Sequence, residues 1–330
     1  MAVEFDQRLS RTFILGAGFS ASQQFPLMRD LRERLVHFLE AERHFSYWQF
    51  LRPRSDGLPE GPFYTGLKRA DPSDSLQFEE LLTKLSNQLK TASSEDPCWI
   101  TRDVLSMGCA RLLWCIHNSI WRVEATYENF ANWVGTRPET ETNAILSFNW
   151  DILAEQALHD ADIPWAYSLA DSTTVPVLKP HGSVNWNTYL REGLQANYSH
   201  WRPISPDSRF SYDSANPFSN PDRQEVHPSL RYMIFPGNPE LPEKDEDIGL
   251  IWKEAERAIG NRDIVVFLGY SLPSYDSYAL KFFKRVCKDK RIEVHDPDPT
   301  CLERFRSELG NDVKVFKEKF EHSPYALKCA

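Results

Sequence analysis

The feature that most constrains the fold of this chain is a short apolar run that leads directly into a pair of glycines. Thr12-Phe13-Ile14-Leu15 has no polar alternation, which is typical of a strand buried on both faces of a parallel sheet. Gly16-Ala17-Gly18-Phe19-Ser20 follows at once, in a chain with only 14 glycines. The next apolar positions have the spacing of one helix face, at Leu27, Leu31, Leu35, Phe38 and Leu39. A strand, a glycine turn and a helix in this order indicate an α/β domain.

The same alternation of strand and helix returns after residue 143. The expected strands are Ala144–Phe148, Val177–Pro180, Tyr232–Phe235, Ile264–Leu268 and Arg291–Val294. The helical patterns between and after them are Ile152–Leu158, Ile251–Ile259 and Ala279–Val286. This alternation predicts a doubly wound, Rossmann-like parallel sheet.

Two stretches interrupt the α/β pattern. Residues 41–142 contain helical patterns among loops, so we expect a helical module inserted into the domain. Residues 185–230 are rich in Asn, Ser, Pro, Tyr and Trp with little periodicity, which predicts a second, loop-rich insertion. The Rossmann-like domain would then comprise residues 1–40, 143–184 and 231–330.

Charge and cysteine usage exclude several classes of protein. The formal net charge of −9 disfavours direct binding of nucleic acid, and no apolar run is long enough to span a membrane. The first residues lack a secretory signal, so we expect a cytoplasmic protein with reduced thiols. The cysteines form no C-x-x-C pair, which disfavours a four-thiolate zinc site, and they are Cys98, Cys109, Cys115, Cys287, Cys301 and Cys329.

Small or polar residues follow five of the expected strands. They are Gly16, Ala17 and Gly18 after the first strand, Asn149 and Asp151 after the second, His181 after the third, and later Ser271 and Asp296. In open parallel sheets, ligands bind outside the carboxyl ends of the strands. The sequence therefore predicts a binding site at this edge of the sheet.

Each of these residues also has a structural explanation. The glycine loop is either a strand-to-helix turn or a cradle whose backbone N–H groups hold a diphosphate at a helix N-terminus. Asn149 and Asp151 are alternatively caps of the following helix, and His181 is alternatively a core histidine. Asp296, which precedes a proline, is alternatively part of a turn.

Taken together and in this order, the motifs resemble the sirtuin superfamily. Gly16-Ala17-Gly18-Phe19-Ser20, continued by Phe25-Pro26 and Arg29, is similar to the sirtuin run G-A-G-x-S…I-P-x-F-R. Three further motifs resemble sirtuin segments. Phe148-Asn149-Trp150-Asp151 resembles the Q-N-x-D run, and His181-Gly182 resembles the catalytic H-G. Gly269-Tyr270-Ser271-Leu272 stands where sirtuins have a G-T-S-L loop. The resemblance covers about 1–40, 143–186 and 231–300.

The chain departs from sirtuin deacylases in one informative respect. Those enzymes carry four zinc cysteines after the H-G, and residues 182–286 contain no cysteine. The runs 179–186 and 269–273 look instead like the bacterial sirtuin-like proteins of antiphage defence, which hydrolyse NAD and lack the zinc module. The resemblance implies a sirtuin-like fold, NAD as the substrate, nicotinamide and ADP-ribose as products, and no zinc.

The resemblance also implies roles for individual residues. Nicotinamide leaves as a neutral molecule through an oxocarbenium-like state, so no strong general acid is required. Asn149 is expected to hold water or the ribose, Asp151 to accept from the nicotinamide amide, and His181 to act as the base, because an unperturbed imidazole titrates near neutral pH. The remaining contacts to NAD are assigned to Gly16, Ala17, Gly18 and Ser20 at the diphosphate, to Arg29 at a phosphate or ribose, and to Gly269, Ser271 and Asp296 at the adenosine half.

Two alternative functions use the same pocket: a protein deacylase or ADP-ribosyltransferase, and a non-catalytic sensor of NAD or ADP-ribose. An unrestrained hydrolase would drain its host of NAD. We therefore expect control in trans, through a homo-oligomer or a partner encoded nearby, such as a translocase-type ATPase, an Argonaute-like protein or a phage sensor. The helical module is the expected contact surface.

Overall fold

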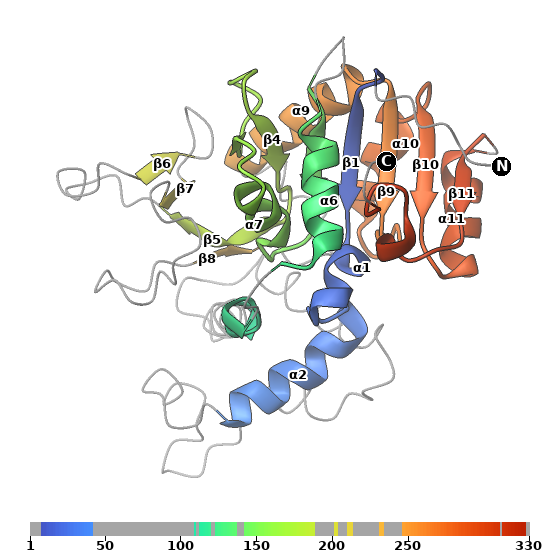
Figure 1. Ribbon diagram of the computed structural model, residues 1–330. Coiled ribbons are helices and arrows are strands. Elements are labelled where there is room, and N and C mark those ends of the chain that lie inside the picture. The colour runs from blue at the N-terminus through green and yellow to red at the C-terminus, as the bar shows by residue number, and fades with distance from the viewer. Residues whose placement is uncertain are drawn as a thin grey trace.

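The computed structural model describes residues 8–41, 109, 112–119, 123–136, 142–188, 201–203, 210–213, 231–233, 246–310 and 312–327. A seven-stranded sheet forms its centre, in the order β11-β10-β9-β1-β2-β4-β3, and every neighbouring pair is parallel (Figure 1). The strands are β1 (Arg11–Leu15), β2 (Ala144–Ser147), β3 (Trp165–Ala166), β4 (Val175–Leu178), β9 (Ile264–Leu268), β10 (Arg291–His295) and β11 (Lys314–Phe316). The predicted parallel sheet is confirmed.

Helices cover both faces of this sheet, which explains why its central strands are continuously apolar. On β1, successive side chains point to opposite faces. The Thr12 hydroxyl donates to the Ala258 carbonyl of α9 (Glu246–Gly260) at 3.0 Å, whereas the Phe13 ring packs edge-on against Phe130 of α6 (Ala125–Val134) at 5.3 Å. The sheet is therefore doubly wound, as expected.

The remaining helices extend these two layers. Phe267 of β9 contacts Phe283 of α10 (Ser277–Val286) at 5.1 Å and Phe305 of α11 (Pro299–Leu309) at 4.7 Å, so both helices lie on the α9 face. On the opposite face, α7 (Leu153–Asp160) packs against α6. The shorter elements are α1 (Ala17–Ser20), η1 (Ala21–Gln23) and η5 (Phe320–His322), and α2 (Met28–Ala41) follows the glycine loop.

A second sheet corrects two sequence-based expectations. Its antiparallel strands, in the order β6-β7-β5-β8, are β5 (Gly182–Thr188), β6 (Trp201–Pro203), β7 (Phe210–Asp213) and β8 (Arg231–Met233). Residues 185–230 therefore contain strands and are more than a loop-rich insertion. Residues 231–233 pair with β5 and do not join the parallel sheet. Strands of three or four residues are too short to produce a readable alternation, which explains the error.

The segment predicted to be a separate helical module, residues 41–142, contributes one helix to the α/β domain itself. Part of it, α6, belongs to the layer that covers the central sheet. Residues 112–119 are helical, as the apolar stripe predicts, and Trp114 is buried with its Nε1 donating to the Val184 carbonyl at 3.2 Å. The helical pattern that begins at Phe78 lies outside the described residues.

Most cysteines of the described part are buried thiols. Cys109, Cys287 and Cys301 are buried, Cys115 is exposed, and none of these four forms a disulfide within the described residues. Burial raises the pKa of Cys109 and of Cys287 to about 12, which keeps both thiols protonated and unreactive. Within the described residues, no group of three His, Cys, Asp or Glu side chains is arranged to hold a metal ion. In that same part of the chain, no helix is long and apolar enough to cross a membrane.

Candidate active site at the carboxyl edge of the sheet

The strand order creates a topological switch point between β1 and β9. From β1 the chain proceeds to β2 and β4 on one side, whereas β9 leads to β10 and β11 on the other. Open α/β sheets bind ligands outside the carboxyl ends of the strands at such a point. The predicted site residues follow the sheet order along this edge: Asp296 after β10, Gly269 after β9, Gly16 after β1, Asn149 after β2 and His181 just beyond β4.

The two glycine loops meet backbone to backbone at the switch point. The Gly18 N–H donates to the Gly269 carbonyl at 2.9 Å, and the Gly16 N–H donates to the Leu268 carbonyl at 3.2 Å. A Cβ on Gly16 would lie 2.5 Å from the Tyr270 Cα, and a Cβ on Gly18 would lie 2.8 Å from the Gly269 Cα. Glycine is required at both positions because no side chain fits between the loops.

This packing limits how the glycine loop can hold a diphosphate. The N–H groups of Gly16 and Gly18 already have carbonyl acceptors. The Ala17 N–H lies at the first position of α1, where no preceding helical turn supplies an acceptor. Contact between the loop and a diphosphate stays a prediction, and it now depends on Ala17 and on side chains beside the loop.

Asn149 is held firmly against the glycine loop. Its Nδ2 donates to the Gly16 carbonyl at 2.8 Å and to the Ser20 hydroxyl at 3.1 Å. Because a carbonyl can only accept, the amide nitrogen must face Gly16, which fixes the orientation of the amide. Its Oδ1 accepts no hydrogen bond from the described residues. The buried side chain thus offers a fixed, neutral acceptor.

Asp151 lies beside this pair and has two kinds of contact. Its Oδ1 accepts from the N–H of Leu153, the first residue of α7, whose N-cap is Ile152, at 3.0 Å. Burial raises the pKa of Asp151 above the usual aspartate range, and the nearby Lys179, Leu153 N–H and Ser20 hydroxyl oppose this rise only in part. Ser20 therefore lies close to both Asn149 and Asp151 on the α1 side of the edge.

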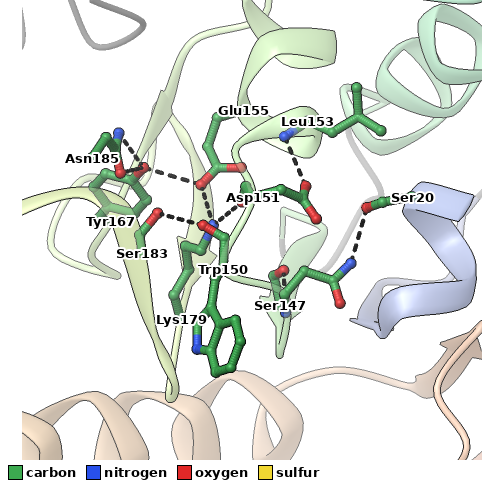
Figure 2. A network of polar contacts seen from close by, with 11 residues as sticks. Ser20, Ser147, Trp150, Asp151, Leu153, Glu155, Tyr167, Lys179, Ser183 and Asn185 are labelled. Carbon is green, nitrogen blue, oxygen red and sulfur yellow. Dashed lines mark hydrogen bonds and ion pairs between the residues drawn. The ribbon is translucent and has the colours of Figure 1, made fainter. Parts of the chain in front are cut away.

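A buried ion pair supports the turn that follows β2, residues 149–151 (Figure 2). The Lys179 ammonium lies 2.9 Å from the Glu155 carboxylate, and it also donates to the Asp151 carbonyl. The Tyr167 hydroxyl contacts the same Glu155 oxygen at 3.0 Å and the Asn185 side chain at 2.9 Å. These contacts tie the ends of β2 and β4 to α7 and β5, which holds the Asp151 backbone in place.

His181 occupies a different pocket of side chains from Asn149. Its Nε2 lies 3.0 Å from the Asp276 Oδ2, and both side chains are largely buried. Its backbone carbonyl accepts from the Trp150 Nε1 at 3.0 Å, so the β2 turn also positions the histidine. The following Gly182 has φ +77°, a conformation that glycine adopts without strain. Among the described residues, no hydrogen bond joins Asn149 to His181.

One aromatic ring, Phe148, packs against the histidine and belongs to a cluster of aromatic rings. Phe148 meets the His181 ring edge-on at 4.9 Å and the Tyr270 ring at 4.7 Å, and it also contacts Trp252 and Phe283. The buried Tyr270 hydroxyl has no hydrogen-bond partner among the described residues. Burial, and then the Asp276 charge, raises the pKa of Tyr270, so the hydroxyl stays neutral. Apolar walls of this kind exclude water from around a base.

The residues assigned to the adenosine half follow the neighbouring strands β9 and β10, where the Gly269 N–H donates to the His295 carbonyl at 3.1 Å. Asp296 is buried, its Oδ1 accepts from the Asp298 N–H at 2.8 Å, and burial raises its pKa. This contact is the turn that the structural explanation predicts. Ser271 is exposed, and its carbonyl accepts from Arg304 at 3.3 Å. Arg29 lies in α2, and its side chain is outside the described residues.

Asp276 is the residue of the site that the sequence analysis missed. We expected the helix to begin at Ala279, whereas α10 begins at Ser277 and Asp276 is its N-cap. An aspartate directly before a helix is an ordinary capping signal, and it would have drawn attention to this carboxylate. Its contact with His181 depends on the tertiary structure alone.

Comparisons with known proteins find solved structures of low sequence identity. No family model matches the chain, and no curated protein matches it. Solved structures of Sir2 enzymes are similar to it. One is described as "Structural Basis for the Mechanism and Regulation of Sir2 Enzymes". It is 16% identical in sequence, has a TM-score of 0.43, and the match covers 96% of this chain and 90% of that one. A Sir2 enzyme bound to a propionylated peptide has 11% identity and a TM-score of 0.39, covering 94% and 88%. We take no residue role from either.

Proposed function

We propose that this protein hydrolyses NAD to nicotinamide and ADP-ribose at the carboxyl edge of β1, β2 and β4. The observation that carries the proposal is the fixed Asn149 amide. Both of its hydrogens are used by Gly16 and Ser20, which leaves Oδ1 as an acceptor beside the switch point. A neutral amide oxygen orients a water or a ribose hydroxyl at every pH, without a charge that would have to be desolvated.

The chemistry requires little more than orientation and a base. Water adds to the ribose carbon as the bond to nicotinamide breaks, and nicotinamide leaves with the bonding electrons. His181 takes the proton of the water, a step that typically contributes about 10²–10⁴-fold to the rate. The Asp151 carboxyl, beside Asn149, accepts from the carboxamide of the leaving group. The Phe148 ring, which packs against His181, helps to exclude competing water.

The other half of NAD extends along the edge towards β10. We place the diphosphate beside Ala17 and Ser20, with Arg29 at a phosphate or ribose. The adenosine half then reaches Gly269, Ser271 and Asp296. An acid at the ribose favours a free 2′-hydroxyl over a 2′-phosphate, which supports NAD over NADP.

The biological setting follows from the sequence resemblance. Lys179 to Trp186 and Gly269 to Pro273 are similar to bacterial sirtuin-like defence proteins, and this supports an NAD-depleting effector of antiphage defence in the cytoplasm. We further propose that the activity is controlled in trans, by a homo-oligomer or by a partner encoded nearby. The same resemblance supports a site that works without zinc.

The test is to incubate the purified protein with NAD, alone and with its genomic neighbour, and to quantify nicotinamide and ADP-ribose. Asn149→Ala is the informative variant. Asn129→Ala is its control, because Asn129 lies on α6 and its side chain bonds to the Ala326 carbonyl rather than to a candidate site residue. We expect release by the wild type and by the control, and loss of release in Asn149→Ala.

Two other outcomes would contradict the proposal. Release of nicotinamide only when an acylated peptide is present would identify a deacylase. Binding of NAD without release under any of these conditions would identify a sensor.

A further inference from the structure

We propose that Tyr127 is a positioning residue, whose hydroxyl holds the short helix α1 so that Ser20 fixes the Asn149 amide. Its role in catalysis rests on the proposed function, whereas its effect on the amide does not. The inference starts from one buried contact: the Tyr127 hydroxyl donates to the Phe19 carbonyl at 2.6 Å. Tyr127 belongs to α6, one of the helices that cover the central sheet (Figure 1).

The hydrogen bonds around this phenol have one consistent direction. A carbonyl can only accept, so the single proton of the Tyr127 hydroxyl lies towards Phe19. The Ser22 hydroxyl, whose oxygen is 2.7 Å from the Tyr127 oxygen, then donates to the phenol. One hydroxyl group therefore holds two points of the segment after the glycine loop, Phe19 in α1 and Ser22 in η1.

Helix α1 depends on support of this kind. It has only four residues, and its N-cap, Gly16, has no side chain with which to cap it. Helices this short are not stable through their own hydrogen bonds. The N–H groups of Gly16 and Gly18 donate to carbonyls at the end of β9, which fixes the beginning of α1. The Tyr127 hydroxyl fixes the other end, because Phe19 directly precedes Ser20, the last residue of the helix.

Tyr127 can hold α1 because it is itself held rigidly. Its side chain is fully buried, and its ring packs against the rings of Phe19 and Phe320, both at 5.1 Å. Further along α6, Phe130 packs edge-on against Phe13 of β1 at 5.3 Å, which anchors the helix to the central sheet. The hydroxyl therefore has a defined position relative to β1 and to the glycine loop that follows it.

The end of α1 carries one of the two acceptors that orient Asn149. The Asn149 Nδ2 donates to the Gly16 carbonyl and to the Ser20 hydroxyl. Gly16 directly follows β1, so the sheet holds the first acceptor. Ser20 directly follows Phe19, so Tyr127 holds the second. Loss of the Tyr127 hydroxyl should therefore loosen the contact between Asn149 and Ser20 and leave the contact with Gly16.

The experiment observes the Asn149 amide directly. We would record side-chain amide signals by NMR in the wild type, in Tyr127→Phe and in Tyr325→Phe. Asn149→Ala identifies the Asn149 signals, and Ser20→Ala shows where they lie when the Ser20 hydroxyl is absent. Phenylalanine keeps the ring at position 127 and removes only the hydroxyl. Tyr325 is the matched control, because its buried hydroxyl donates to the Glu293 carboxylate of β10 at 2.7 Å rather than to α1.

We expect the Asn149 signals of Tyr127→Phe to move towards their positions in Ser20→Ala, and the amide protons to exchange faster with solvent. In Tyr325→Phe these signals should stay at their wild-type positions. Urea unfolding should show a loss of stability in both variants, because each loses a buried hydrogen bond. In the NAD assay, Tyr127→Phe should lower kcat about tenfold, as loss of one hydrogen bond does, with little change in KM. Tyr325→Phe should change neither constant.

Each contrary result has a distinct meaning. Unmoved Asn149 signals in a folded Tyr127→Phe, or equal movement in Tyr325→Phe, would overturn the positioning role. If Tyr127→Phe does not fold, Ser22→Ala takes its place, since it removes the donor to the phenol oxygen, and unmoved signals there would overturn the role as well. Moved signals with an unchanged kcat would overturn the link to catalysis. Moved signals in a protein whose wild type releases no nicotinamide would refute the proposed function and leave the positioning role supported.

Discussion

Gly18 and Gly269 touch through their backbones. The Gly18 N–H donates to the Gly269 carbonyl at 2.9 Å, and a Cβ on Gly269 would lie 2.4 Å from the Gly18 carbonyl carbon. The contact joins the ends of β1 and β9 across the switch point. This contact fixes the position of the two glycine loops beside the candidate site.

Gly269→Ala should therefore destabilise the protein strongly. The new methyl group meets backbone atoms, and Gly269 also has φ +59°. Gly310→Ala is the control, because Gly310 has φ +113° and nothing within 4 Å of the added Cβ. We expect a loss of about 1 kcal/mol for Gly310→Ala, from strain alone, and a larger loss for Gly269→Ala. Urea unfolding measures both, and equal losses would refute the close contact.

Asp151→Asn should stabilise the fold at neutral pH. Burial raises the pKa of Asp151, so the folded state binds its proton more tightly than the unfolded state does. Stability from this group therefore falls as pH rises from about 4, the unfolded value, through the folded pKa, and then stays constant. The asparagine variant lacks this loss, so its advantage should appear at pH 7 and vanish below pH about 4.

The control variant for this prediction should change the stability at pH 7 in the opposite direction. Hydrogen bonds from Thr173 lower the pKa of the exposed Asp171, so Asp171→Asn should lose a little stability at pH 7. Free energies of unfolding at pH 3.5 and pH 7 test both variants. A stability advantage of Asp151→Asn that is the same at both pH values would contradict the assignment.

Lys179→Met should be among the most destabilising substitutions. It leaves the buried Glu155 carboxylate without its cation, and breaking a buried pair costs about 3–5 kcal/mol. Adding Glu155→Gln should recover part of the loss. Lys284→Met removes a partly exposed pair with Glu308 and should cost no more than about 1 kcal/mol. Similar losses for the two lysines in chemical unfolding would refute the burial argument.

Asn149→Ala and His181→Ala should each abolish cleavage of NAD while the fold is retained. We expect kcat to fall at least about 10²-fold in each case, because orientation of water and removal of its proton are both lost. Nicotinamide release measures the rate, and circular dichroism checks folding. Wild-type turnover in a folded double variant would remove both residues from the mechanism.

Asp296→Ala should weaken the preference for NAD over NADP. Loss of the acid removes the group that favours a free 2′-hydroxyl, so the ratio of kcat/KM for the two substrates should fall. The same variant loses the turn contact to Asp298, which thermal unfolding would detect. An unchanged ratio would assign Asp296 to the turn alone.

The sequence by itself determined the parallel sheet and the edge at which the candidate site residues lie. Thr12 to Leu15 and Ile264 to Leu268 are apolar without alternation, and only strands covered on both faces need that pattern. The polar or small residues after each strand could be placed at one edge, because parallel strands end on the same side. These patterns are local in the sequence, so they can be recognised without knowing which strands are neighbours in the sheet.

Only the tertiary structure decided which residues meet. The contact between Gly18 and Gly269 requires β1 and β9 to be adjacent, and the His181–Asp276 pair requires the loop after β9 to reach the end of β4. Strand order and loop paths depend on packing between segments distant in sequence, which no local pattern encodes. The short strands β6 and β7 were missed, and the expected strand at β8 was placed in the wrong sheet, for the same reason: the stability of these strands comes from pairing with one another and with β5 rather than from their own periodicity.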